Sequence, residues 1–224
     1  MPLTAALWLD LQGIVTWYRF EIPRTLRRMS IAVWITVAIG VAALLTAYFY
    51  VDSQLSPGGI APDKLAQAGT AVHNALISGF PAGVLFRNNL QVELAIIGLG
   101  IFSFSVLGMV VYIGNLALIG GVLAGSKILG LSPLLIFASG ILPHAIFELP
   151  SVVLASSAVL YLGVELVTPK DGRSIGEAFI VLIAHLFKIM LGLCVPLLIL
   201  AALVEARITP VLFDHFIGNA LRLH

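Results

Sequence analysis

Ionisable side chains that lie inside long apolar stretches are the first chemical feature of this sequence. They are Glu93, His144, Glu148, His185 and Lys188. Such groups cost a few kcal/mol each in the hydrocarbon of a membrane and usually face a polar interior or a partner. His144 and Glu148 are four residues apart, so on a helix they share one face and can share a ligand. An imidazole and a carboxylate in this arrangement can supply two ligands to a zinc-like ion or form a proton site.

Two ligands do not complete a metal site. A third would have to come from another segment, such as Glu93 or Glu205, and spacing alone places neither beside the pair. The other interpretation is structural: His144 and Glu148 satisfy each other and the backbone groups that a nearby proline frees. We favour the structural interpretation and expect no cofactor. A divalent metal ion bound by His144, Glu148 and Glu205 is the alternative.

Amide and basic side chains extend this polar set. Asparagines at the ends of apolar helices can cap backbone groups or bridge neighbouring helices. Lys188 reaches the membrane surface only poorly from the middle of a span, so we expect it to pair with an acidic side chain. The predicted polar intramembrane motif comprises His144, Glu148, Glu205, Asn88, Asn89, Asn115 and Glu93.

Known catalytic motifs are missing from the sequence. It has no serine in a nucleophile elbow, no phosphate-binding Walker loop and no HExxH pair. The segment from His144 to Glu148 reads HAIFE, with glutamate in the place of the second histidine of a metalloprotease helix. We therefore assign no catalytic residue and favour a protein that is not an enzyme.

The composition indicates where these residues lie. Of the 224 residues, 60% are hydrophobic and 10% are charged, and the mean hydropathy is +1.08. Globular domains carry roughly 25% charged residues, so a water-soluble enzyme is excluded. The net charge of +1 is too balanced for capture of a nucleic acid. We expect a multi-pass protein of the cell membrane.

The elements that position the polar residues are apolar helices. A span needs about 20 apolar residues, because roughly 30 Å of hydrocarbon is crossed at about 1.5 Å per residue. This criterion predicts an all-α transmembrane bundle in residues 30–210, with spans at 30–51, 90–112, 113–129, 132–167 and 176–204. We expect a turn at Gly114-Asn115, where one apolar stretch is too long for a single span. We also expect a broken helix from Pro143 to Pro150, because proline lacks a backbone donor.

Residues 1–29 form a separate segment. Leu7, Leu11, Ile14 and Tyr18 repeat at helical spacing, which is typical of an amphipathic helix at the membrane surface. By the positive-inside rule, the arginines before the first span place the amino terminus in the cytoplasm. These arginines are Arg19, Arg24, Arg27 and Arg28. We expect a loop at residues 56–63 on the outer side, a surface helix at 65–80 and a tail at 211–224.

Small residues repeat every four positions on the third span. Ala117, Gly121 and Gly125 would lie on one helix face, and such faces let two backbones approach closely. We expect this face to pack inside the bundle, because a multi-span protein has its own helices to pack. A homodimer contact is the alternative.

Several motifs of the chain occur in a defined order and spacing. They are FRNN at 86–89, Gly98, Gly100, Asn115, LPHAIFELP at 142–150 and ALVEARITP at 202–210. In this arrangement the chain resembles the stage II sporulation protein M family of membrane proteins. Two glycines that are usual in the family are replaced here, by Leu116 after Asn115 and by Ala145 after His144.

The resemblance implies a polytopic helical protein without an established enzymatic activity. In endospore formers the family member looks like a membrane scaffold that holds two peptidoglycan-degrading proteins during engulfment. The transferable expectation is a scaffold or assembly factor whose partners are membrane lipid and other membrane or envelope proteins. The alternative is a transporter or a metal-dependent membrane enzyme that uses His144, Glu148 and Glu205.

Overall fold

The computed structural model describes residues 15–55, 80–168 and 174–218, and within these ranges the chain is helical and contains no β-strand. Stretches long and apolar enough to cross a membrane are Ser30–Gln54, Ala82–Phe102, Val106–Leu129, Pro133–Val167 and Ile175–Arg207. These five stretches confirm the prediction of an all-α polytopic bundle.

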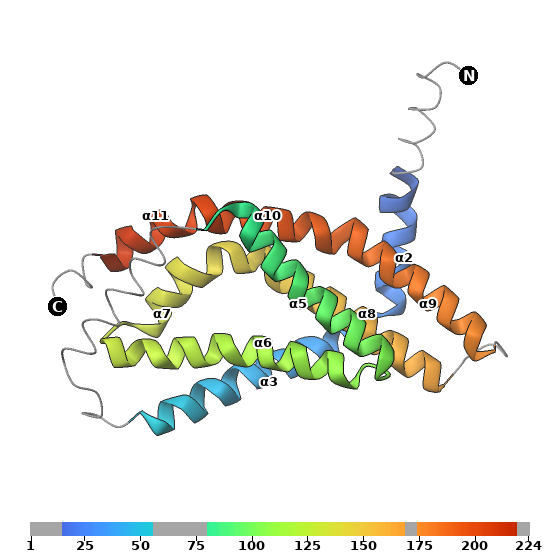
Figure 1. The fold of residues 1–224 in the computed structure, drawn as a ribbon, viewed down its shortest axis with the longest axis horizontal. Coiled ribbons are helices and arrows are strands. Elements are labelled where there is room, and N and C mark those ends of the chain that lie inside the picture. The colour runs from blue at the N-terminus through green and yellow to red at the C-terminus, as the bar shows by residue number, and fades with distance from the viewer. Residues whose placement is uncertain (1–14, 56–79, 169–173, 219–224) are drawn as a thin grey trace, which may run out of the picture.

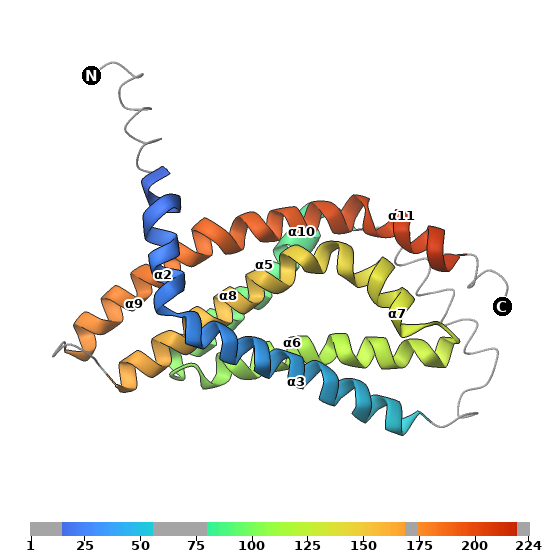
Figure 2. The ribbon, with the colours of Figure 1, turned by 180° about the vertical axis from the view of Figure 1, so that it is seen from behind.

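Helix α8 (Leu142–Val167) lies at the centre of the bundle. It contacts α3 (Ser30–Gln54), α5 (Ala82–Phe102), α6 (Val106–Gly125) and two helices of the last span, α9 (Ile175–Ile189) and α10 (Val195–Arg207). The short helix α11 (Thr209–Phe213) follows α10. Helices α3 and α6 lie side by side, and the chain from α9 to α11 runs over the opposite side of α8 (Figures 1 and 2). Every other spanning stretch therefore packs on the helix that carries His144 and Glu148.

The turn between the second and third spans lies at residues 103–105 and not at Gly114-Asn115, where we predicted it. Helix α6 runs unbroken through Gly114 and Asn115. The prediction failed because glycine and asparagine favour a turn only where the chain has to reverse. Here Asn115 lines a pocket. The α-helical hydrogen-bond pattern of α6 continues past it.

Backbone conformation and packing together hold this turn. Phe104 and Ser105 have positive φ angles of 51° and 76°, which L-residues seldom adopt. The hydroxyl of Ser103 accepts a hydrogen bond of 2.8 Å from the backbone N–H of Leu107. Gly163 of α8 backs the turn, since a Cβ at that glycine would lie 2.6 Å from the Phe104 carbonyl oxygen. The turn therefore packs closely against Gly163, where any side chain would collide with it.

The fourth span bends before the predicted proline motif. A short helix α7 (Pro133–Ile136) leads into a π-helical turn at Phe137–Ile141, and α8 begins immediately afterwards. Pro143 stands in the first turn of α8, where its missing N–H costs nothing. The expected break does not extend to Pro150, because α8 continues through it. Figure 2 shows the bend between α7 and α8.

Helices α6 and α3 approach each other closely at Gly120. A Cβ on this residue would overlap the carbonyl oxygen of Leu44 and lie 3.0 Å from the backbone nitrogen of Tyr48. About two turns earlier on α6, the buried hydroxyl of Tyr112 donates to the carbonyl oxygen of Thr36 at 3.0 Å. A glycine is required at position 120 because the α3 backbone occupies the space of a side chain.

The predicted packing face at Ala117, Gly121 and Gly125 does not make this approach. A Cβ on Gly121 would meet only Val51, at 3.9 Å, and a Cβ on Gly125 would meet nothing within 4 Å. The backbone contact with α3 is made instead at Gly120, about 100° around the helix from Gly121. A helix face with small residues shows where backbones can approach, but the partner helix decides which glycine is used.

The amino-terminal helical segment, residues 17–28, is tied to the last span by polar contacts. Tyr18 donates from its hydroxyl to the carbonyl oxygen of Gly192 at 2.8 Å. Lys188 donates to Glu21 at 2.7 Å, so its expected acidic partner exists. This hydrogen bond favours the charged carboxylate and holds the pKa of Glu21 below its ordinary value of 4.5. The pair therefore persists at neutral pH and is lost as the pH falls through that lowered pKa.

Some predicted features lie outside the described residues. They are the first part of the amphipathic segment with Leu7, Leu11 and Ile14, the loop at 56–63, and nearly all of the helix expected at 65–80. The end of the tail after residue 218 also lies outside them.

Candidate functional site

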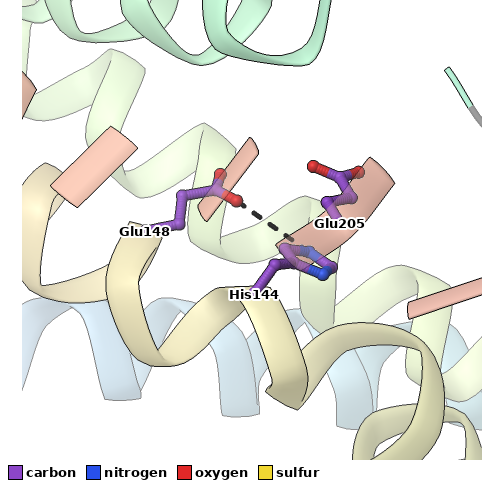
Figure 3. Close-up of side chains that lie close together, drawn as sticks. All are labelled: His144, Glu148 and Glu205. Atoms are coloured by element: carbon purple, nitrogen blue, oxygen red, sulfur yellow. Dashed lines mark ion pairs between the residues drawn. The ribbon is translucent and has the colours of Figure 1, made fainter. Parts of the chain in front are cut away.

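Three residues of the predicted motif meet between α8 and α10 (Val195–Arg207). His144 and Glu148 stand one turn apart near the start of α8, and Glu205 of α10 points toward them (Figure 3). One ligand atom from each of these side chains lies within 4.8 Å of the other two. Spacing alone placed neither Glu93 nor Glu205 beside the pair, and the alternative metal site named Glu205 as the third ligand. The structure brings Glu205 to the pair.

A hydroxyl positions the imidazole of His144. Its Nδ1 lies 3.3 Å from Oγ1 of Thr209, which is buried at the start of α11 (Thr209–Phe213). Its Nε2 lies 3.9 Å from Oε2 of Glu148. When Nδ1 donates to the threonine, the lone pair of Nε2 is left to face the carboxylate of Glu148.

Sequence analysis did not single out Thr209, because one hydroxyl in an apolar helix gives no charge signal. One signal was available: Thr209 follows Glu205 by four residues within the ALVEARITP motif, so both belong to one helix face.

Glu93 adds a deeply buried carboxylate beside this cluster. Its side chain on α5 is only 1% exposed, and neither carboxylate oxygen has a hydrogen-bond partner. The neighbouring hydroxyl of Ser151 donates instead to the carbonyl oxygen of Cys194 at 3.1 Å. Glu148 is close enough to Glu93 for their charges to interact. Glu93 is therefore a further buried acidic group, and no described base forms an ion pair with it.

No lysine or arginine within the described ranges forms an ion pair with Glu93, Glu148 or Glu205. Isolated carboxylates in a low-dielectric interior are costly unless a proton or a cation compensates them. Among the residues that the structure describes, the imidazole of His144 is the basic group that pairs with Glu148.

A pocket of about 240 Å³ between α6 and α8 opens onto this motif. Asn115, His144 and Glu148 are among the residues that line it, and the other lining residues are apolar. Two of these, Leu118 and Val122, are 69% and 58% exposed on α6. The pocket therefore joins the lipid-facing surface of α6 to the polar residues of α8.

The remaining asparagines of the motif take different positions. Asn88 is exposed on α5. Asn89 is half-buried near Glu148, but its buried amide nitrogen has no hydrogen-bond partner. Of the three predicted asparagines, Asn115 is the one that lines the pocket.

One known protein family matches most of the chain, including the spans and the three clustered residues. The family model described as Stage II sporulation protein M matches residues 31–210, about four fifths of the chain. The match contains His144, Glu148 and Glu205, and it starts at the first span, well before residue 86, where the motif resemblance begins. Neither the search of curated proteins nor the search of solved structures returned a match.

Proposed function

This chain belongs to the stage II sporulation protein M family, and from that membership we propose that it is a membrane scaffold or assembly factor. It holds other membrane or envelope proteins and has no catalytic activity of its own. The observation that carries the proposal is the pocket between α6 and α8, which exposes polar groups on a lipid-facing surface.

The chemistry of the pocket fits a transmembrane helix that carries a polar side chain. Helices in a bilayer gain little from apolar contact, since lipid is equally apolar, so close packing and hydrogen bonds direct their association. Asn115 offers both donors and acceptors, and Glu148 offers a carboxylate. A volume of about 240 Å³ is smaller than the roughly 300 to 1,000 Å³ of typical small-molecule sites. It suits one side chain of a partner.

Filling the mouth of the pocket tests this function. Val122→Trp should reduce at least tenfold the amount of partner protein that co-purifies with the chain in mild detergent, because the indole occupies the partner's place. Ile180→Trp is the matched control, since Ile180 is 70% exposed on α9 and lies outside the pocket. Equal recovery of the partner with both variants, at equal expression and monodispersity, would contradict the proposal.

We further infer that the amino terminus is cytoplasmic, because three arginines of α2 (Ile22–Arg28) immediately precede the first span. Ser53→Cys, at the far end of that span, should then react with a membrane-impermeant maleimide on intact cells. The wild type is the control, because its single cysteine, Cys194, is buried. Labelling of Ser53→Cys only after the cells are permeabilised would reverse the orientation.

A further inference from the structure

His144 and Glu148, which line the pocket, lie beside Glu205 of α10, which does not line it. We propose that His144, Glu148 and Glu205 bind one divalent transition-metal ion of the zinc class. The proposal does not depend on the scaffold role, because metal binding is a property of the purified chain. It rests on geometry, on orientation of the imidazole and on charge balance.

The geometry needs little change to accept an ion. Zinc binds imidazole nitrogen and carboxylate oxygen at about 2.0 to 2.2 Å, so two ligands of a tetrahedral ion lie about 3.4 Å apart. The ligand atoms here lie within 4.8 Å of one another, and the His144–Glu148 distance is 3.9 Å. Each separation has to shorten by at most about 1.4 Å, which rotation of glutamate side chains provides.

The imidazole is oriented as in known metal sites. Histidine ligands nearly always donate their second ring N–H to an oxygen, which fixes the tautomer and points the free nitrogen at the metal. Thr209 provides such an oxygen at 3.3 Å from Nδ1. The contact comes from the start of α11, four residues beyond Glu205, so the end of α10 carries one ligand and the start of α11 carries the group that orients another.

Charge balance favours a divalent ion. When ionised, the two carboxylates of the cluster are balanced by one divalent ion, and the described lysines and arginines form no ion pair with them. One imidazole with two carboxylates suits Zn²⁺, Mn²⁺ or Fe²⁺ better than Ca²⁺ or Mg²⁺, which prefer oxygen ligands alone. With three protein ligands, the fourth position is open to a water molecule or to a partner's side chain in the pocket.

Metal content of the purified chain tests the site. The protein in detergent is stripped with a chelator, equilibrated with micromolar Zn²⁺ alone and desalted, and bound zinc is measured by elemental analysis. We expect one zinc per wild-type chain and less than a tenth of that in Glu205→Gln. His215→Ala is the control, because His215 is exposed and lies outside the cluster, and it should retain the full stoichiometry.

A second readout guards against variants that fail to fold. Co²⁺ in place of Zn²⁺ should give the wild type a visible absorption band whose intensity reports a low coordination number. Glu205→Gln should lose this band while its metal-free form elutes and melts like the metal-free wild type. The proposal is overturned if the wild type binds no zinc, or if folded Glu205→Gln keeps its zinc. Either failure leaves the partner-recovery experiment with Val122→Trp unaffected.

Discussion

Gly120→Ala should lower the stability of the protein by about 1 to 3 kcal/mol, the usual cost of overpacking a tight interface. The added Cβ would overlap the backbone of α3 at Leu44. Backbone cannot move aside as a flexible side chain can, so α3 and α6 must separate along their contact. The measurement is the melting temperature in detergent, with size-exclusion elution as a check on aggregation.

A glycine-to-alanine substitution at Gly125 should not destabilise the protein. A Cβ there meets nothing within 4 Å, and alanine is favoured over glycine inside a helix by up to about 1 kcal/mol. Gly125→Ala should therefore keep or raise the melting temperature. If Gly120→Ala is neutral while Gly125→Ala destabilises, the close contact lies on the face that sequence spacing predicted.

The second large effect is expected at the polar cluster in the presence of zinc. A ligand at 100 times its dissociation constant stabilises the folded state by about 2.7 kcal/mol. His144→Ala and Glu148→Ala should each lose this stabilisation, which corresponds to roughly 5 to 10 °C in melting temperature for a chain of this size. The double variant should lose little more than either single one, because the site is already broken.

The same four melting temperatures, measured again with a chelator present, distinguish a metal site from a structural pair. Without metal, the melting temperatures of the wild type, the two single variants and the double variant should differ only by the effects of local packing. Losses that keep their size in the chelator would instead show that His144 and Glu148 stabilise the fold through their mutual contact.

Hydropathy was sufficient to predict the bundle, because the bilayer demands about 20 apolar residues for each span. It placed the start of the second span near Leu90, whereas α5 begins at Ala82. Polar residues at the start of α5, including Asn88 and Asn89, lowered the hydropathy there. Packing of α5 against α10 extends the helix through them.

The positions of bends were harder to predict, because π-helical turns have no strong sequence signature. Those at Phe137–Ile141 and Met190–Cys194 interrupt otherwise continuous apolar helices. The first lies immediately before the helix of His144 and the second before that of Glu205. The residue types therefore indicated which side chains could bind a cation. Helix packing, which the sequence does not give, decides that His144, Glu148 and Glu205 meet.

We propose that a partner helix binds over the pocket between α6 and α8. A photo-crosslinking residue at Val122, irradiated in native membranes, should form a protein adduct, and the adduct should weaken when Glu148→Gln is added. The same probe at Ile180, which is similarly exposed on α9, should react with lipid alone. If Val122 also reacts with lipid alone, or if its protein adduct is indifferent to Glu148→Gln, the pocket is not the partner site.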